Sequence, residues 1–285
     1  MNWKKYSSQT KIFSFLILFA LASNLSSDIE DNIALHKEQF SEVALKIWEY
    51  AELGYQETKS SNLLASELEK EGFKITKRVA GIPTAFVAEF GSSGPVIGIL
   101  GEFDALPGLA QTNSPFKEVA INDSGGGHAC GHHLFGAASA WAAVSIKEWL
   151  VENDIEGTVR FYGTPAEEGG SGKVYMVREG LFDDVDVVLH WHPDDVNSAN
   201  PKTSNSNKSA KFTFKGISAH AAGSPELGRS ALDGVEAMNM MVNMMREHIP
   251  QESRMHYVIT KGGLAPNVVP DLAEVYYYVR HPEMK

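Results

Sequence analysis

The stretch Pro95-Val96-Ile97-Gly98-Ile99-Leu100 is almost entirely apolar, and Gly101-Glu102-Phe103-Asp104 follows it directly. A short apolar run bounded by turn residues is typical of a strand that is buried on both faces of a sheet. Carboxylates that follow such a strand stand at its carboxyl end, where α/β sheets carry their functional loops. The run therefore predicts an α/β fold with acidic residues at its working edge.

Helical and extended segments alternate on both sides of this run. Helical periodicity begins after the capping residues Ser27 and Asp28 and ends at Gly54, and it returns in three later segments. The later helices are expected at 59–72, 134–150 and 173–179, and the other strands at 84–90, 158–162 and 185–190. This alternation predicts a doubly wound α/β sheet.

The stretch 194–208 is rich in Asn, Ser and Asp and breaks this rhythm, so a domain boundary is expected there. Beyond it, a strand at 210–214, a methionine-rich helix at 230–247 and strands at 255–260 and 273–279 predict a small α+β module. The methionines are expected to pack adaptably at a core or helix contact rather than to bind a soft metal.

Composition excludes several classes of protein. The formal net charge of -11 argues against a nucleic-acid or anionic-membrane partner, because either would need a surplus of Lys and Arg on one face. The single cysteine, Cys130, rules out an intrachain disulfide, so the core must hold the fold.

The first residues have the pattern of a secretory signal. Lys4, Lys5 and Lys11 precede an apolar run from 12 to 22 that ends in Ala20-Leu21-Ala22, a small-residue cleavage pattern. We therefore expect residues 1–22 to be removed, and the protein to be exported to the periplasm or secreted without stable membrane insertion. An uncleaved anchor is the alternative, although the run is shorter than the roughly 20 apolar residues that span a bilayer.

The densest group of metal-ligand residues is Gly125-Gly126-Gly127-His128-Ala129-Cys130-Gly131-His132-His133. Thiolate and imidazole together suit zinc or a similar borderline cation, and the spacing of Cys130 and His132 places both on one side of an extended loop. The alternative is a buried, inert cysteine beside loop histidines.

Two further groups follow strands. Glu167 and Glu168 come after the strand at 158–162, where one carboxylate can ligate a cation while its neighbour acts as general base. A solvated helix N-terminus is the simpler explanation of such a pair. His190-Trp191-His192-Pro193 closes the last apolar strand of this part. Candidate ligands on three separate loops are hard to explain as packing.

Together these segments resemble the aminoacylase-like amidohydrolases of peptidase family M20, and their details are closest to the aminobenzoyl-glutamate hydrolase branch. The matching segments, in order, are 101–107, 128–132, 164–170 and 191–193, followed by 219–222, 228–233 and 262–271. The resemblance implies a zinc-peptidase-like catalytic domain, begun by residues 23–203, that is interrupted by a lid or dimerisation domain at 204–285.

The resemblance also assigns roles to single residues. It implies that Cys130, His132, Glu168 and His192 ligate one or two divalent metal ions, zinc or manganese. Glu167 would be the base that activates water, and Asp104 would orient a metal ligand from behind.

Three residues of the second domain receive roles in the same way. His220 would reach the substrate, in this family often across a dimer interface, and Asn267 and Arg280 would hold the substrate's carboxylate or the developing oxyanion. A turn histidine and an ordinary charge at a strand end are the alternatives for His220 and Arg280.

The chain departs from the family pattern in two ways. His133 stands where members usually carry Asp or Asn, so the surroundings of the metal or the preference for one metal can differ. Family chains also continue well beyond position 285 and supply a final metal-ligating histidine. The resemblance therefore implies an incomplete sequence that is inactive or weakly metal-binding as written.

The expected function is metal-assisted hydrolysis of the amide bond of an N-acyl amino acid, with aminobenzoyl-glutamate as the expected small-molecule substrate. The expected assembly is a homodimer or a heterodimer with a related chain. Two alternatives stay open: thiol catalysis with Cys130 as nucleophile, and a non-catalytic exported protein that binds metal or peptide.

Overall fold

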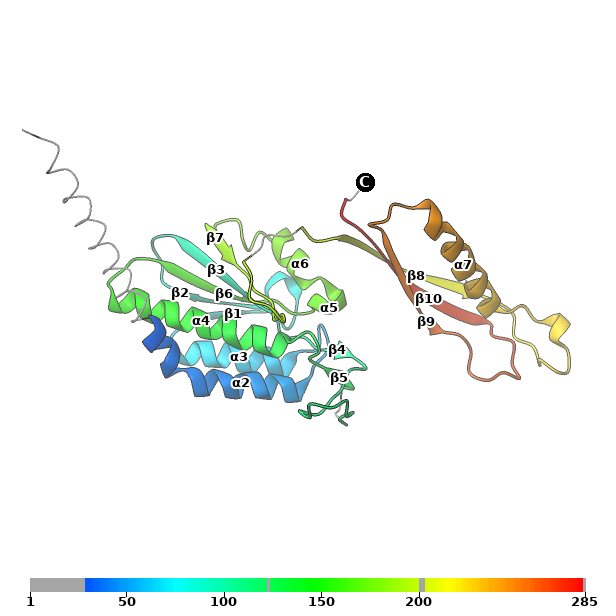
Figure 1. Ribbon diagram of the computed structural model, residues 1–285, viewed down its shortest axis with the longest axis horizontal. Coiled ribbons are helices and arrows are strands. Elements are labelled where there is room, and N and C mark those ends of the chain that lie inside the picture. Colours follow the sequence, from blue (N-terminus) through cyan, green and yellow to red (C-terminus); the bar gives the residue numbers. More distant parts are fainter. Residues whose placement is uncertain (1–28, 122–123, 200–202, 284–285) are drawn as a thin grey trace, which may run out of the picture. The chain divides into compact units, whose positions relative to one another are not determined.

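A computed structural model describes residues 29–121, 124–199 and 203–283 of the chain (Figure 1). The chain divides between Val196 and Asn197 into two compact units. The expected signal segment, residues 1–22, lies outside the described residues, as do the expected capping residues Ser27 and Asp28. Among the helices that are described, none combines the length and the apolar character needed to cross a membrane.

The first unit is built on a five-stranded sheet with the order β1-β2-β6-β3-β7. Its strands are β1 (Lys74–Lys77), β2 (Phe86–Phe90), β3 (Val96–Gly101), β6 (Thr158–Gly163) and β7 (Val187–Leu189). The strands β6, β3 and β7 are parallel, whereas β1 and β2 run antiparallel to their neighbours. The sheet is therefore mixed, with its parallel part where the sequence analysis placed the acidic edge.

Helices cover both faces of this sheet, which confirms the predicted α/β class. The helices α2 (Lys37–Tyr50), α3 (Thr58–Lys70) and α4 (His132–Glu152) lie on one face (Figure 1). Phe40, Ile47 and Leu64 of these helices are buried in one core with Phe86 of β2 and Phe161 of β6. Burying each such side chain contributes about 1.5–3 kcal/mol. On the opposite face, Met176 of α6 (Gly172–Arg178) packs with Leu100 and Tyr162.

The N-terminal helix differs from the prediction in its interior and at its C-terminal end. A helical stretch at 29–35 is separated from α2 by a turn at His36, and α2 ends at Tyr50 because Ala51 adopts a left-handed conformation. Gly54 does not end the helix. It lies against Ala166 instead, where an added Cβ would approach the Ala166 Cα to 3.1 Å.

Short elements complete the first unit and shape its loops. A 3-10 turn, η1 (Val79–Gly81), precedes β2. The two-residue strands β4 (Leu106–Pro107) and β5 (Gly126–Gly127) pair in antiparallel fashion just before the cysteine motif. The turn α5 (Glu167–Gly170) carries the acidic pair directly before α6.

The second unit has the predicted β-α-β-β order. Its antiparallel sheet has the order β8-β10-β9, with β8 (Ser206–Lys215), β9 (Arg254–Lys261) and β10 (Leu272–His281). The helix α7 (Ala231–Met245) begins where the Ser230 side chain accepts a hydrogen bond from the Asp233 backbone. The 3-10 turns η2 (Pro225–Leu227) and η3 (Arg246–His248) flank this helix.

The core of the second unit lies between α7 and the sheet. Val235 of α7 is buried against Ala273, Val275 and Tyr277 of β10. The methionines divide into two groups, because Met238 packs against this core while its neighbours are exposed. The exposed methionines of the helix are Met240, Met241, Met244 and Met245.

Candidate metal centre

The predicted ligands of the first unit follow the ends of parallel strands. Asp104 comes after β3, Glu168 after β6 and His192 after β7. Because these strands are parallel neighbours, their carboxyl ends meet at one edge of the sheet. His132 is added to this edge as the first residue of α4.

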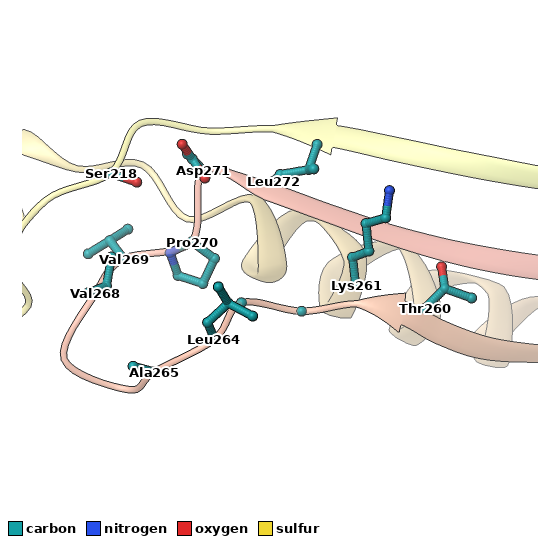
Figure 2. Close-up of a pocket in the computed structure, with 12 residues that line it drawn as sticks. Ser218, Thr260, Lys261, Leu264, Ala265, Val268, Val269, Pro270, Asp271 and Leu272 are labelled. Atoms are coloured by element: carbon teal, nitrogen blue, oxygen red, sulfur yellow. The ribbon is translucent and has the colours of Figure 1, made fainter.

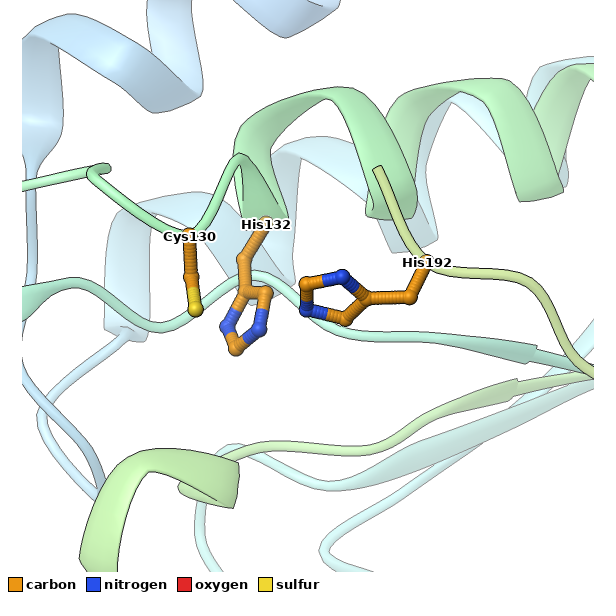
Figure 3. Close-up of side chains that lie close together, drawn as sticks. All are labelled: Cys130, His132 and His192. Atoms are coloured by element: carbon orange, nitrogen blue, oxygen red, sulfur yellow. The ribbon is translucent and has the colours of Figure 1, made fainter. Parts of the chain in front are cut away.

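Cys130, His132 and His192 converge at this edge (Figure 3). Each offers one ligand atom, and these atoms lie within 4.8 Å of one another. Gly131 permits the approach, since its φ of 79° lets the chain turn between Cys130 and the start of α4. The fourth predicted ligand is also close, with Glu168 Oε1 4.0 Å from His132 Nε2.

Asp104 links two of these residues and is itself 1% exposed. Its Oδ1 lies 2.9 Å from His132 Nδ1, and its Oδ2 accepts a hydrogen bond of 2.9 Å from the Glu168 backbone N–H. Engagement of Nδ1 leaves Nε2 of His132 as the nitrogen that faces the cluster. This is the geometry in which a carboxylate behind a histidine fixes the tautomer and the ring orientation of a metal ligand.

Glu102 also reaches the cluster, although sequence reasoning gave it no role. It is 2% exposed, and its Oε2 lies 2.9 Å from His132 Nε2. Its Oε1 forms an ion pair with Lys173 at the start of α6 and lies 3.6 Å from His190 Nε2. The available sequence signal was its position at the carboxyl end of a buried strand, two residues before Asp104.

The residues present fit a divalent cation. Three of the buried side-chain atoms that lack a hydrogen-bond partner within the described chain belong to this cluster: Glu102 Oε2, His132 Nε2 and Glu168 Oε1. Buried polar atoms are normally satisfied, and a converging set of carboxylate and imidazole atoms is what a cation satisfies. Cys130 adds the soft donor that suits zinc.

The charges around the cluster oppose a free thiolate. Burial, followed by a hydrogen bond to Glu168 and the charges of nearby carboxylates, raises the pKa of Cys130 to about 12. Burial lowers the basicity of His132, but its close carboxylates Asp104 and Glu102 outweigh this and raise its pKa to about 10. A reactive cysteine needs an electropositive setting, so these surroundings disfavour Cys130 as a nucleophile.

Glu167 lies beside the ligands with its side chain exposed. It belongs to a second group of close ligand atoms, formed with Glu102 and His132. Loss of hydration, then the charges of Glu102 and Glu168, raise the pKa of Glu167 above its ordinary value. A carboxylate with a raised pKa next to candidate metal ligands is placed to accept a proton from water.

The other histidines of the cysteine motif serve packing. His128 Nε2 lies 3.0 Å from the Ile47 carbonyl oxygen, and the ring of His128 lies 5.2 Å from that of His133. Burial lowers the pKa of each ring to about 4, so both are neutral at physiological pH. His133, the departure from the family pattern, therefore contacts His128 and lies outside the groups of close ligand atoms.

The predicted substrate residues belong to the second unit. His220 and Val268 form an isolated β-bridge, and the Ala221 backbone donates to the Asn267 carbonyl oxygen, so two distant motifs meet there. His220 Nδ1 accepts hydrogen bonds from the backbone of Ala222 and Gly223. The neutral imidazole therefore carries its proton on Nε2, which can act as a donor.

Arg280 lies near the C-terminal end of β10, far from the Asn267 loop that precedes this strand. It is eight positions beyond Leu272 on β10, which places it roughly 26 Å from the Asn267 end of that strand at about 3.3 Å per residue. Its guanidinium lies 5.3 Å from the centre of the Tyr278 ring. Asn267 and Arg280 of one chain therefore cannot hold the same small substrate together.

The loop at 262–271 borders a cavity of about 530 Å³ (Figure 2). Its walls are mainly apolar, with Leu264, Val269 and Pro270 among the lining residues. The Lys261 amine and the Asp271 carboxylate are its charged groups. None of the predicted site residues lines this cavity.

Comparison with known proteins agrees with the geometry. Residues 98–273 match the model of peptidase family M20/M25/M40. The chain is 48% identical over 257 residues to one of the subunits of p-aminobenzoyl-glutamate hydrolase of Escherichia coli (strain K12), covering 90% of this chain and 53% of that protein. It is 32% identical over 261 residues to the Xaa-Arg dipeptidase of Mus musculus, covering 87% and 56%. The chain thus spans about half the length of these relatives.

Solved structures show the same fold. A Bacillus subtilis protein described as a dinuclear metal-binding peptidase of the M20 family is 25% identical, with a TM-score of 0.55 and coverage of 88% of this chain and 65% of that one. The aminobenzoyl-glutamate utilization protein of Klebsiella pneumoniae has a TM-score of 0.59 at 18% identity, covering 90% and 70%. The matched residues include the whole cluster at the sheet edge, and the chain belongs to peptidase family M20/M25/M40.

Proposed function

We propose that this protein is a metal-dependent amidohydrolase that cleaves the amide bond of an N-acyl amino acid. The observation that carries the proposal is the convergence of Cys130, His132 and His192, whose ligand atoms lie within 4.8 Å of one another. Family membership and the similarity to part of a known hydrolase support it.

Cys130, His132, Glu168 and His192 would hold one or two divalent cations, zinc or manganese. A bound cation of this kind polarises the scissile carbonyl and makes a water molecule more acidic. The similarity to a dinuclear metal-binding peptidase supports a site for two cations. Asp104 would hold the His132 ring with one carboxylate oxygen and the Glu168 backbone N–H with the other.

Glu167 is the proposed general base. Its raised pKa suits a group that accepts a proton from water and then returns it to the leaving amine. The adjacent Glu168, whose backbone N–H is held by Asp104, would serve as the ligand. Neighbouring carboxylates would thereby divide the two tasks.

His220 and Asn267 are the proposed donors for the developing oxyanion. His220 presents an Nε2–H because its Nδ1 accepts two backbone hydrogen bonds. The Asn267 loop is joined to the His220 loop by backbone contacts, so the two residues lie on neighbouring segments. Donors fixed before the reaction stabilise an oxyanion without reorganisation.

We propose p-aminobenzoyl-glutamate as the substrate. The identity of 48% to part of a hydrolase named for this compound supports the assignment. The compound carries carboxylates, which suit an amide donor such as Asn267 or the guanidinium of Arg280. Since these side chains stand at opposite ends of β10, we assign only one of them in each chain to a given substrate molecule.

An association with a second chain is also proposed, either another copy or a related protein. The relative in Escherichia coli is named as one subunit of a hydrolase. In the second unit, β9 is an edge strand, and it exposes Val258 and Ile259. Exposed methionines on α7 adjoin this edge, and adaptable apolar side chains of this kind are frequent at binding surfaces.

The proposal is tested by assaying p-aminobenzoyl-glutamate hydrolysis together with the metal content of the purified protein. Glu167→Gln is expected to keep its metal while kcat falls by about 10²–10⁴-fold, because the base is lost and the ligands remain. Glu179→Gln, an exposed glutamate at the end of α6, is the matched control and should retain full activity.

Chelation should abolish turnover in the wild type, and added zinc or manganese should restore it. Wild-type activity in Glu167→Gln would remove the proposed base, and full turnover in metal-free protein would remove the metal-dependent mechanism. Alkylation of Cys130 gives a further check, since a ligand role predicts loss of metal along with activity.

A further inference from the structure

Glu102 has a buried carboxylate to which the reaction described above gives no task. Its two oxygens face different neighbours: Oε1 pairs with Lys173, and Oε2 lies 2.9 Å from His132 Nε2. Neither Oε2 nor His132 Nε2 has a hydrogen bond within the described chain, because Nδ1 of His132 is engaged by Asp104, so the two atoms face each other as acceptors unless a proton or a cation lies between them. An unsatisfied buried carboxylate oxygen is costly, so its position calls for a bound group.

The same oxygen belongs to a donor group. Glu102, His132 and Glu167 each offer one ligand atom, and these atoms lie within 4.8 Å of one another. Because Asp104 engages Nδ1 of His132, Nε2 is the nitrogen that remains for a cation. Glu102 therefore faces the same imidazole nitrogen that Cys130 and His192 approach from the other group.

Charge balance leads to the same conclusion. Glu102, Asp104, Glu167 and Glu168 bring four carboxylates to this edge of the sheet, and a coordinating Cys130 would add a thiolate. Lys173 is the cation paired with this group, and its side chain is only 26% exposed. A protonated His132 adds a second positive charge only while its Nε2 is not bound to a metal. Four carboxylates exceed these two charges, whereas divalent cations would balance them.

Resting on the metal-dependent function proposed above, we propose that Glu102 is a further carboxylate donor of the metal centre and that Lys173 moderates its attraction for cations. Lys173 holds Oε1 and leaves Oε2 directed at the cluster. Both residues also line a cavity of about 300 Å³ next to Glu167 and His190. Glu102 and Lys173 therefore border both the ligand cluster and the cavity beside Glu167, the proposed base.

The proposal makes opposite predictions for the two members of the ion pair. Glu102→Gln removes a donor and a negative charge, so metal binding should weaken about 10–100-fold. Lys173→Met removes a nearby positive charge and frees Oε1, so metal binding should tighten, by about tenfold. If the pair only held α6 against β3, both substitutions would change metal affinity in the same direction or leave it unchanged.

The experiment is a titration of metal-depleted protein with Zn²⁺ by calorimetry and with Co²⁺ by visible absorption, which reports the donors around the ion. Glu89→Gln is the matched control, because Glu89 is also paired with a cation, Arg160 of a neighbouring strand, away from the cluster. Far-ultraviolet circular dichroism of each metal-free variant establishes that the fold is kept. Glu102→Asp provides a second, charge-preserving variant, with an expected affinity between those of the wild type and Glu102→Gln.

The outcomes separate this inference from the proposed function. Weaker binding in Glu102→Gln, tighter binding in Lys173→Met and an altered Co²⁺ spectrum in the former support it. Wild-type affinity and spectrum in Glu102→Gln overturn the inference while the metal-dependent function stands. A wild-type protein that binds neither ion overturns both. Should Glu102→Gln not fold, weaker or equal binding in Lys173→Met overturns the proposal by itself.

Discussion

The carboxylate of Glu57 lies fully buried beneath the loop that carries Glu167 and Glu168. Its Oε1 accepts a hydrogen bond of 2.8 Å from the Ala166 backbone, and its Oε2 accepts one of 2.9 Å from the Thr84 hydroxyl. Ala166 has a φ of 57°, which is uncommon for a residue other than glycine. Glu57 therefore holds the strained residue from which the acidic loop starts.

Two substitutions of Glu57 distinguish the effect of its hydrogen bonds on stability from the effect of its charge. Glu57→Ala leaves the Ala166 N–H unsatisfied and opens a cavity, so the free energy of unfolding should fall by about 2–4 kcal/mol. Glu57→Gln keeps an acceptor for Ala166 and should preserve the fold. Urea denaturation measures the free energy of unfolding of both variants. Glu57 directly precedes α3, and Glu69 lies on the exposed side of that helix, so Glu69→Ala and Glu69→Gln are the controls.

The pH dependence of the same variants has a definite sign. Burial raises the pKa of Glu57 from 4.5 to about 7, so the folded state favours the protonated carboxyl. The wild type should therefore lose stability relative to Glu57→Gln as the pH rises from 4.5 to 7. A constant difference between the two proteins from pH 5 to 8 would contradict this interpretation.

At the scale of single residues, the sequence predicted the candidate metal ligands but not all of the buried charged residues around them. Cys130, His132 and the histidines at 190 and 192 were candidate donors because of their residue types and their places near strand or helix ends, and the family resemblance selected His192. Glu102 and Lys173 are separated by some 70 positions, and nothing in their types or spacing shows that they pair. Glu57 has the sequence context of an ordinary glutamate before a helix, because only tertiary packing buries it.

Among the elements, the buried strands were the most predictable. The strands β3 and β6 begin and end within one or two positions of the predicted ranges, because burial on both faces demands continuous apolar residues. The edge strand β1, Lys-Ile-Thr-Lys, was not predicted since it is mostly exposed and polar. The break at His36 was also missed, because helical periodicity continues across it.

His36 at that break connects two helices. Its Nε2 lies 2.8 Å from Glu148 Oε1 of α4, and its Nδ1 lies 3.1 Å from Gln39 Oε1 of α2. Burial opposes the charged ring, but the hydrogen bonds with Glu148 and Gln39 outweigh it and raise the pKa of His36 above 6.5. The protonated ring can donate to both partners at once.

Replacing His36 by alanine should therefore destabilise the protein in a pH-dependent way. A raised histidine pKa gives stability that is fully present below pH 6.5 and is lost as the pH rises through the folded-state pKa. Urea denaturation at pH 5.5 should show a loss of about 1 kcal/mol that shrinks at pH 9. His248→Ala, in an exposed pair with Glu247, is the control. An equal loss at both pH values would show that His36 acts through packing alone.

At the scale of the whole molecule, the division between the two units lies within the stretch 194–208, which is poor in apolar residues. The expected boundary lay between 203 and 204, whereas the chain divides between Val196 and Asn197. Both positions fall in the stretch rich in Asn and Ser, which has no periodicity that could fix the joint more closely. The separation of Asn267 and Arg280 followed already from the predicted strand at 273–279, whose ends they flank. Their proposed roles came from resemblance, which carries no distance within the chain.

The location of the ligands predicts how metal should stabilise the two units. Among the residues that the structure describes, the tryptophans are Trp48, Trp141, Trp149 and Trp191, all before Val196, so tryptophan fluorescence reports the first unit, which also holds every proposed ligand. A metal present at about 100 times its Kd should stabilise that unit by roughly 2.7 kcal/mol. The fluorescence transition should then rise by several degrees and return after chelation.

Peptide-resolved hydrogen exchange tests whether this stabilisation is confined to the first unit. Metal should slow exchange in α4 and the loops after β3, β6 and β7, while β8, β10 and α7 should exchange at unchanged rates. The ligands come from different segments of one unit, so binding energy is spent on holding those segments together. Equal protection of both units would require metal contacts from the second unit, and no protection anywhere would place the cation outside this cluster.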